Sequence, residues 1–193
     1  PEVSHGAAGH YGQVLMKVGA DGWLKGVRRI ASPNCDARPP GMAIDLLVIH
    51  NISLPPGKFG GQAITELFTN RLDCSVDPYY ARLEGLRVSA HFLIRRDGET
   101  IQFVPCGRRA WHAGVSEWRG RAACNDFSLG IELEGSDDQP FTDRQYGALA
   151  HLTRKLSRVY PIRDIAGHSD IAPGRKTDPG PHFDWDRYLA WVR

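Results

Sequence analysis

Blocks of apolar residues along the chain predict strands of two kinds. Residues 45–51, DLLVIHN, contain a continuous apolar run and predict a strand that is buried on both faces. Residues 127–135, FSLGIELEG, alternate instead, so that Glu132 and Glu134 share the face opposite their apolar neighbours. The other predicted strands are a hairpin over 88–104, with a type I′ turn at Asp97-Gly98, and a short strand over 163–166.

Three segments carry apolar residues three and four positions apart, as in amphipathic helices: residues 61–71, 143–160 and 184–192. The second has the clearest start, because Thr142 and Gln145 match a capping box. Its apolar positions are Tyr146, Leu149, Leu152, Leu156 and Val159. Strands and helices in this order predict an α/β (α+β) fold with a central mixed β-sheet flanked by helices.

The length of 193 residues fits a single domain with a sizeable core. Residues 1–22 are rich in Gly and Ala, and we expect them to form a poorly packed N-terminal extension. The domain itself is therefore assigned to residues 23–193.

Charge and cysteine content narrow the class of protein. A net charge of +2 gives no reason to expect nucleic acid as a partner. No apolar run approaches the roughly 18 residues of a membrane span, and the N-terminus has no secretory pattern. The four cysteines form no CxxC pair and are expected to be free thiols in a reducing cytoplasm, with one or two secretory disulfides as the open alternative.

Two histidines and one aspartate are candidates for a metal site. His50 lies at the end of the strand over 45–51, and His168 follows the strand over 163–166. Strand ends are where α/β sheets commonly place their sites, and Asp178 follows in a Gly- and Pro-rich segment that can fold back. Two imidazoles and a carboxylate match a catalytic zinc site, which keeps a fourth position for water. Spacing alone leaves open that these are ordinary core and loop residues.

Other residues have a functional and a structural interpretation. Glu132 can serve as a general base, or lie on a solvated strand face. Lys176 can stabilise an oxyanion, or be an exposed lysine. In the segment WHAG, Trp111 can stack on a sugar or peptide plane, or sit half-buried in a turn. His91 alternates with apolar neighbours and is predicted to be a hydrogen-bonded core histidine.

Several blocks of sequence, taken together, closely resemble the AmpD type of N-acetylmuramoyl-L-alanine amidase. The blocks are LLVIHNISLPPGKFG, VSAHFLIRRDG, RAWHAGVS, CNDFSLGIELEG and GHSDIAPGRKTDPGPHFDW, spread in order over roughly residues 23–186. Related amidase and peptidoglycan-recognition families share the metal-ligand pattern but match fewer of these blocks.

The resemblance implies a zinc site at one edge of the sheet. His50, His168 and Asp178 match the family's zinc ligands. Glu132 matches the acidic residue proposed to activate water, and Lys176 matches the lysine proposed to stabilise the oxyanion.

The resemblance also implies contacts with substrate. The family lines its cleft at positions matched here by Asn51, Trp111 and Ala113. Arg87 matches an arginine associated with a carboxylate of the peptide stem. A second such arginine falls at Ala123 here, with Arg121 nearby as a substitute, so this sequence departs from the pattern at that position.

The implied activity is zinc-dependent hydrolysis of the amide bond between the lactyl group of 1,6-anhydro-N-acetylmuramic acid and L-alanine. The expected partner is a cytoplasmic 1,6-anhydro-muropeptide from cell-wall recycling, bound by a monomer, with no nucleic acid or membrane involved. Three alternatives stay open: a recognition module that binds muropeptide without cutting it, a secreted or phage-type amidase that lyses intact wall, and an unrelated metallohydrolase. The complete set of ligand and catalytic positions argues for catalysis.

Overall fold

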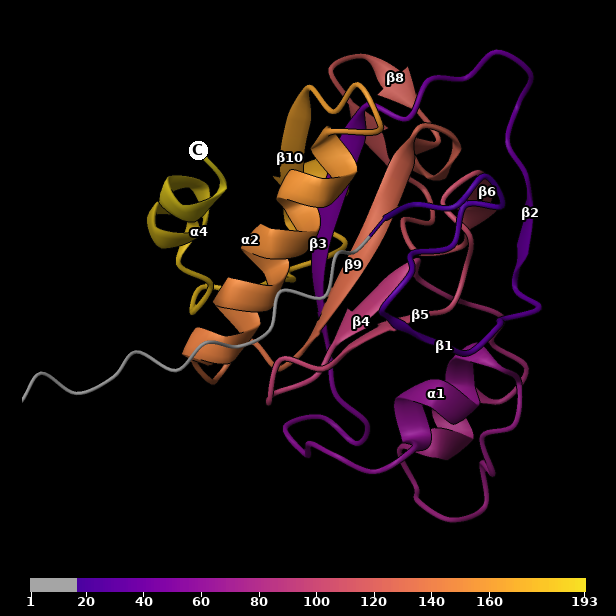
Figure 1. Ribbon diagram of the computed structural model, residues 1–193. Coiled ribbons are helices and arrows are strands. Elements are labelled where there is room, and N and C mark those ends of the chain that lie inside the picture. The colour runs from indigo at the N-terminus through magenta and orange to yellow at the C-terminus, as the bar shows by residue number, and fades with distance from the viewer. Residues whose placement is uncertain (1–16) are drawn as a thin grey trace, which may run out of the picture.

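A six-stranded sheet forms the centre of the computed structural model, which describes residues 17–193 (Figure 1). Its strands, in order across the sheet, are β1 (Arg28–Arg29), β5 (Thr100–Gln102), β4 (Phe92–Ile94), β9 (Ser128–Glu134), β3 (Leu46–Ile52) and β10 (Asp164–Gly167). The pair β4 and β5 is antiparallel, whereas β4–β9, β9–β3, β3–β10 and β1–β5 are parallel. The predicted mixed sheet is thus confirmed.

Helices and short two-stranded ribbons complete the described residues. The helices are α1 (Ala63–Phe68), α2 (Asp143–Ser157), α3 (His168–Ile171) and α4 (Trp185–Val192), with 3-10 turns at Tyr80–Leu83 and Cys124–Asp126. The ribbons pair β2 (Cys35–Ala37) with β6 (Arg108–Ala110) and β7 (Glu117–Trp118) with β8 (Arg121–Ala122). In Figure 1, α2 lies in front of β3 and β9, and α4 lies beside α2.

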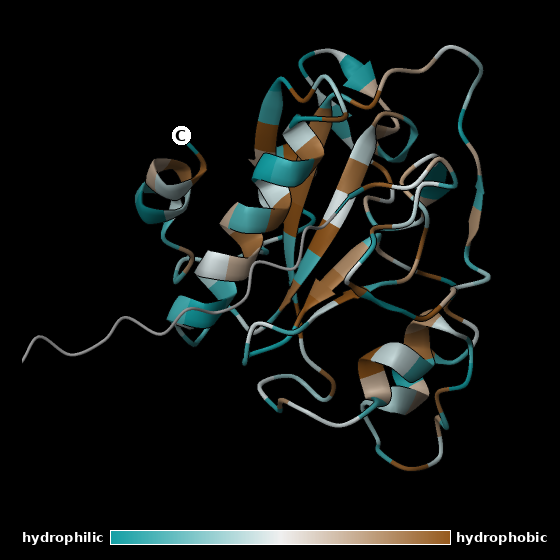
Figure 2. Cartoon of the chain, in the orientation of Figure 1, coloured by the Kyte–Doolittle hydropathy of each residue, from teal (hydrophilic) through white to brown (hydrophobic). Residues whose placement is uncertain are grey.

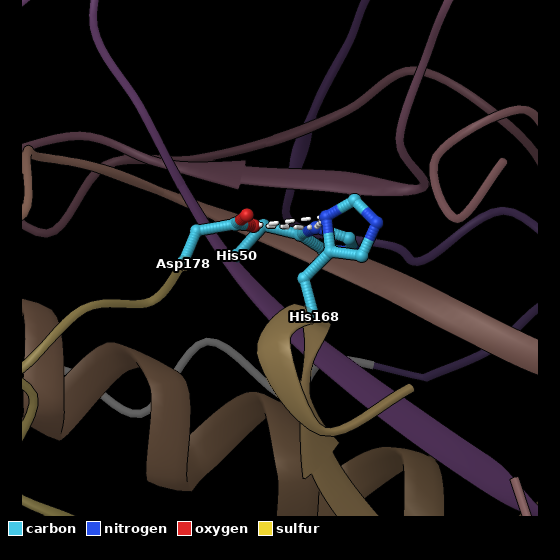
Figure 3. Close-up of side chains that lie close together, drawn as sticks. All are labelled: His50, His168 and Asp178. Carbon is cyan, nitrogen blue, oxygen red and sulfur yellow. Dashed lines mark hydrogen bonds and ion pairs between the residues drawn. The ribbon is translucent and has the colours of Figure 1, made fainter. Parts of the chain in front are cut away.

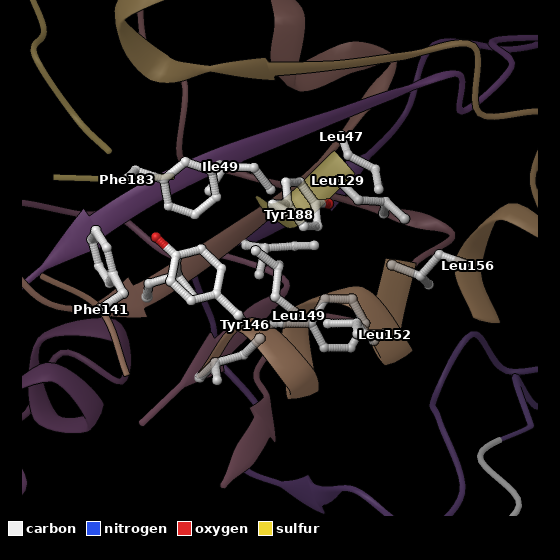
Figure 4. Close-up of a cluster of buried hydrophobic side chains, with 14 of the residues drawn as sticks. Leu47, Ile49, Leu129, Phe141, Tyr146, Leu149, Leu152, Leu156, Phe183 and Tyr188 are labelled. Atoms are coloured by element: carbon white, nitrogen blue, oxygen red, sulfur yellow. The ribbon is translucent and has the colours of Figure 1, made fainter. Parts of the chain in front are cut away.

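The face of the sheet that α2 covers holds the larger part of the core (Figure 4). Alternate residues of the central strands point to this face, among them Leu47, Ile49, Leu129, Ile131 and Leu133. From α2 they meet Tyr146, Leu149, Leu152 and Leu156, and α4 adds the fully buried Tyr188. In Figure 2 the central strands are accordingly rich in hydrophobic residues, and α2 is hydrophilic where it faces outward. Each leucine or isoleucine buried here contributes about 1.5–3 kcal/mol of transfer free energy.

The start of α2 follows the prediction and its end does not. The Thr142 side chain accepts from the Gln145 backbone N–H, and the Gln145 side chain accepts from that of Thr142, so the capping box is present. The helix ends at Ser157, before the predicted stop at residue 160. Val159, predicted as an apolar position of this helix, therefore lies beyond its end and is 53% exposed.

The predicted hairpin forms between β4 and β5, but its turn is not type I′. A type I′ turn needs positive φ at both central residues, and of the pair Asp97-Gly98 only Gly98 has one, at +89°. Gly98 N donates to Arg95 O, and Arg95 N donates to Glu99 O. The loop therefore has three residues and closes on a left-handed glycine, in which the absence of a Cβ avoids a steric penalty.

The opposite face of the sheet carries the polar groups of interest. Because side chains alternate along a strand, His50 points away from Leu47 and Ile49, to the face not covered by α2. Glu132 of β9 lies directly opposite His50 in the parallel register and points the same way. The position of both groups is thus fixed by the most extensively paired strands of the sheet.

Other expectations can be placed against the structure. The predicted N-terminal extension, residues 1–22, lies for the most part outside the described residues. All four cysteines fall inside the described part of the chain, and each is free. Over residues 17–193, no helix has both the length and the apolar character needed to cross a bilayer.

Candidate active site

Three side chains from separate parts of the chain converge where β10 ends beside the carboxyl-terminal half of β3 (Figure 3). Ile49 of β3 pairs with Gly167 of β10, so the next residues, His50 and His168, lie side by side. The loop after α3 returns Asp178 to the same point. The pairing of β3 with β10 therefore brings together two histidines that are far apart in the sequence.

The three groups present their donor atoms to one another in a near-equilateral triangle. His50 Nδ1 lies 3.0 Å from His168 Nδ1 and 3.0 Å from Asp178 Oδ2, and His168 Nδ1 lies 3.1 Å from the same oxygen. Bonds of about 2.0–2.1 Å to a tetrahedral zinc would separate such atoms by roughly 3.3 Å, so only a slight expansion is needed. The donor set and its spacing fit a divalent metal ion.

The site's protonation states also suit a metal ion. Burial lowers the pKa of His50 to about 4, although its hydrogen bond with Asp178 opposes this shift. Burial alone would raise the pKa of Asp178, but hydrogen bonds with His168 and His50 hold it well below the ordinary aspartate value. Neutral imidazole and ionised carboxylate are the forms that bind metals.

One ligand candidate has a fixed tautomer. His168 Nε2 lies 3.1 Å from the carbonyl oxygen of Ala113, and a carbonyl can only accept. Neutral His168 therefore carries its proton on Nε2 and keeps a lone pair on Nδ1, facing the metal position. The buried Ala113 backbone thus supports the site from behind.

Glu132 is a buried carboxyl group without a hydrogen bond to one of its oxygens. Among residues 17–193, its Oε2 has no hydrogen-bond partner and no solvent exposure. Burial and the charge of Asp178 raise the pKa of Glu132 well above the ordinary glutamate value, against the opposing charge of Lys176. A carboxyl group with a raised pKa, in a cavity beside a metal position, has the properties of a general acid-base catalyst.

The loop after α3 is shaped by two residues that carry no predicted chemistry. Asp170 Oδ2 accepts from Gly167 N at 2.7 Å. Arg175 donates to the carbonyl oxygens of Ala113 and Val115, both at 2.6 Å, which ties this loop to the segment beside the site. Lys176, between Arg175 and Asp178, is exposed to solvent and lines the cavity.

A cavity of about 640 Å³ opens onto these groups. Its polar side is lined by His50, Asn51, His112, Glu132, Ser136, Asp137, Asp138, His168, Lys176 and Asp178. Its apolar side is lined by Leu54, Leu67, Phe68, Leu83, Leu86 and Val88. Asn51 is held at the border by hydrogen bonds to Asp137 Oδ1 and Pro179 O. The cavity accommodates a ligand with a polar reacting group and an apolar part.

The other residues predicted to contact substrate, Arg87, Trp111 and Ala113, are not part of the lining of this cavity. Arg87 is exposed and lines a neighbouring hollow of about 310 Å³, which shares Leu67, Leu83 and Leu86 with the main cavity. Neither Trp111, which is half-buried, nor the buried Ala113 is among the residues that line the main cavity.

Arg121 has a structural role that occupies its guanidinium. It donates to both oxygens of Asp45, at 3.1 and 2.8 Å, and lies 3.9 Å from the ring centre of Phe127. In this structure Arg121 therefore does not replace the arginine that was expected at the position of Ala123.

The sequence pattern gave no separate role to His112, which the structure places directly behind His50. The two rings approach at 2.8 Å between His50 Nε2 and His112 Nδ1. The available signal was Gly130, an isolated glycine inside a strand, which often marks a close approach by another group. His91, by contrast, is a buried, hydrogen-bonded core histidine, as predicted.

Comparisons with known proteins agree with this geometry. Residues 40–181 match the family model Amidase_2, N-acetylmuramoyl-L-alanine amidase. The chain is 58% identical over 173 residues to the 1,6-anhydro-N-acetylmuramyl-L-alanine amidase AmpD of Escherichia coli K12, covering 89% of this chain and 94% of that protein. It is 53% identical to the AmpD of Haemophilus influenzae, covering 89% and 95%.

Solved structures extend the comparison. A crystal structure of a selenomethionine AmpD derivative superposes with a TM-score of 0.88 at 56% identity, covering 90% of this chain and 98% of that one. The Escherichia coli amidase AmiD, in complex with anhydro-N-acetylmuramic acid-L-Ala-D-gamma-Glu-L-Lys, gives a TM-score of 0.57 at 32% identity, covering 90% and 65%. Family model, sequence and fold agree, and the chain belongs to the AmpD type of the N-acetylmuramoyl-L-alanine amidase family.

Proposed function

We propose that this amidase uses zinc to hydrolyse the bond between the lactyl carbonyl of 1,6-anhydro-N-acetylmuramic acid and L-alanine of muropeptides. The observation that carries the proposal is the triangle of His50, His168 and Asp178 beside Glu132, whose Oε2 has no hydrogen-bond partner among residues 17–193. The AmpD relatives carry this activity in their names, and a solved structure of AmiD is a complex with a substrate of this class.

The choice of zinc rests on the chemistry of the donors. Two imidazole nitrogens and one carboxylate oxygen are typical of catalytic zinc, whereas magnesium and calcium prefer oxygen ligands alone. His50, His168 and Asp178 would hold the ion. When bound, zinc supplies a Lewis acid for the scissile carbonyl and promotes ionisation of water.

We assign Glu132 the proton transfers. A nearby cation favours its ionised form, in which it can accept a proton from the attacking water. The hydroxyl adds to the lactyl carbonyl carbon, the carbon–nitrogen bond breaks, and Glu132 returns the proton to the departing alanine nitrogen. Its burial and unpartnered Oε2 support this role, because water or substrate can take the free position.

Lys176 is assigned to the oxyanion. Its side chain lines the cavity, and its charge acts on both Glu132 and His50. A fixed ammonium near a developing negative charge lowers the barrier to acyl transfer.

Substrate contacts are proposed at the rim of the cavity. Asn51 lines the cavity next to His50 and is held by hydrogen bonds to Asp137 and Pro179. Arg87, in the adjoining hollow, is positioned for a carboxylate of the peptide stem. Trp111 and Ala113 stay proposed contacts, and a direct contact from either would require a substrate that extends past the cavity.

We also propose that the enzyme acts in the cytoplasm as a monomer, without a nucleic-acid or membrane partner. Four free cysteines, two of them buried, are typical of a reducing compartment. The assignment of residues 23–193 to the amidase domain is part of the same proposal.

Product analysis tests the function. The protein is incubated with anhydro-N-acetylmuramoyl tripeptide and, separately, with intact sacculi, and the products are identified by mass spectrometry. Release of the free tripeptide from the small substrate, with little from sacculi, supports the proposal. Binding without any product indicates a recognition module, and equal release from sacculi indicates a wall-lytic amidase.

A further inference from the structure

His112 lies between a metal-ligand candidate and a serine of the central sheet. Its Nδ1 is 2.8 Å from His50 Nε2, and its Nε2 is 3.1 Å from the Ser128 hydroxyl. The ring is buried, and the backbone N–H groups of His112 and Ala113 both donate to Asn125 Oδ1. These contacts join three side chains into one hydrogen-bonded row.

A glycine provides the space for this ring. A Cβ on Gly130 of β9 would lie 2.4 Å from His112 Cγ, so only glycine fits beneath the imidazole. Ser128 and Glu132 flank Gly130 on the same face of the strand, because they lie two residues away on either side. His112 and His50 meet edge to face, with ring centres 5.0 Å apart and an interplanar angle of 88°. The orientation of His112 is therefore fixed by packing on one side and by hydrogen bonds at both nitrogens.

The two histidines of the proposed metal site differ in what determines their tautomer. His168 Nε2 faces the Ala113 carbonyl, which only accepts, so its Nδ1 keeps a lone pair. His50 Nε2 faces a nitrogen of His112, which can either donate or accept. The tautomer of His50 therefore depends on that of His112.

The wrong tautomer of His50 would exclude a metal ion. With its proton on Nδ1, His50 would donate to Asp178 Oδ2 at 3.0 Å and lose the lone pair that the ion needs. With the proton on Nε2, His50 donates to His112, whose own Nε2–H can donate to the Ser128 hydroxyl. Only the second arrangement presents a lone pair from each imidazole and a carboxylate oxygen to one point.

We propose that His112 is a positioning residue, which accepts the Nε2–H of His50, donates to Ser128, and so holds Nδ1 of His50 ready for the metal ion. This inference rests on the proposed metal role of His50. It concerns the affinity and geometry of the site rather than any contact with substrate.

Two variants of His112 distinguish the effect of its hydrogen-bond acceptor from the effect of its side-chain volume. His112→Phe fills the same space without an acceptor, and zinc affinity should fall by about 10- to 100-fold, as for other outer partners of metal-ligating histidines. His112→Asn places an amide oxygen close to the position of Nδ1 and should recover most of that affinity. Zinc binding is measured by competition with a chromophoric chelator, so no enzyme activity is needed.

His91→Phe is the matched control. His91 is also buried, its ring lies 5.9 Å from that of His112, and it forms hydrogen bonds with Gly130 N, Arg108 O and Arg38. Its replacement should lower thermal stability and leave zinc affinity unchanged. Equal loss of affinity in both variants would mean that packing, not the acceptor, is responsible, and would overturn the proposal.

A measurement on the wild-type protein covers the case in which variants fail to fold. With ¹⁵N-labelled histidine and bound zinc, a through-bond coupling should connect Nε2 of His50 to Nδ1 of His112, with the proton on His50. A proton found on His112 Nδ1 in the zinc-loaded protein would overturn the proposal. Wild-type protein that bound no zinc would overturn the proposed function as well, whereas tight binding by His112→Phe would overturn only this inference.

Discussion

His50 and Glu132 lie directly opposite each other in the neighbouring parallel strands β3 and β9 and point to the same face of the sheet. One is a metal-ligand candidate and the other is the buried carboxyl group proposed to move protons. Their separation is set by the strand spacing of about 4.8 Å rather than by loops. The two functions are thus held together by the paired central strands of the sheet.

Replacement of Glu132 by glutamine should separate metal binding from turnover. Glutamine keeps the shape of the side chain but cannot accept a proton from water, so we expect kcat to fall by about 10²- to 10⁴-fold. Bound zinc should stay at one equivalent, because Glu132 is not among the three ligand candidates. Steady-state hydrolysis and metal analysis of the same sample decide this, and near-wild-type turnover would remove Glu132 from the mechanism.

Replacement of Gly130 by alanine should displace His112 and so weaken the proposed metal site. The new Cβ would overlap the His112 ring, whose nearest atom lies at 2.4 Å, and overpacking of this kind costs about 1–3 kcal/mol. Zinc affinity should fall along with the free energy of unfolding, because His112 must move away from His50.

Gly147→Ala is the control for that substitution. Gly147 lies inside α2, and a Cβ there meets no atom within 4 Å. Alanine should stabilise this helix by up to about 1 kcal/mol and leave zinc affinity unchanged. Similar zinc affinities for Gly130→Ala and Gly147→Ala would contradict the placement of His112.

Two arginines should respond differently to removal. Arg87→Ala should raise KM for a substrate with a stem carboxylate, with little change in kcat or stability, because Arg87 is exposed beside the cavity. Arg121→Ala should instead lower the free energy of unfolding, because it leaves the mostly buried Asp45 without its partner, and KM should not change. The reverse pattern in the kinetics would assign the stem contact to Arg121.

The metal-free protein should lose stability as the pH falls. Burial lowers the pKa of His50 to about 4 and that of His91 to about 3, and it also lowers the pKa of His112. Below the ordinary histidine pKa of about 6.5, the unfolded chain therefore binds more protons than the native one, and stability declines toward the native pKa values. The raised pKa of Glu132 acts in the opposite direction above its ordinary value, but it is one group against three.

Urea unfolding of chelator-treated protein between about pH 7 and pH 5 measures this slope, which can reach about 1.4 kcal/mol per pH unit for each extra proton bound. The Glu132→Gln variant, which lacks the opposing group, should show a steeper decline. A metal-free protein more stable at the lower pH would contradict the neutral state of these buried histidines.

Much of the fold follows from local patterns in the sequence. The apolar run of β3, the alternation of β9 and the capping box of α2 each depend on residues close together in the chain, and all three were predicted correctly. The hairpin was predicted in place, but its turn type was wrong, because the dipeptide Asp97-Gly98 does not determine loop length. The helix was predicted to include Val159 because the apolar periodicity continues past the point where α2 ends.

The arrangement of the site could not be predicted from local sequence patterns. The proximity of His50 to His168 depends on the parallel pairing of β3 with β10, which no local pattern encodes, and it was expected from family resemblance. The buried Tyr188 and the contact between His112 and His50 are tertiary in the same sense. Isolated signals existed, such as the glycine in β9, but they mark a close approach without naming the partner.

The triangle of His50, His168 and Asp178 is proposed to hold the zinc on which amide hydrolysis depends. The most direct test measures release of the stem peptide from anhydro-N-acetylmuramoyl tripeptide by mass spectrometry, before and after complete metal removal and after return of one equivalent of zinc. We predict that activity is lost with the metal and restored with zinc, and that His168→Ala protein shows neither tight zinc binding nor restored activity. Full activity in protein shown to be free of metal would contradict the proposed role of zinc.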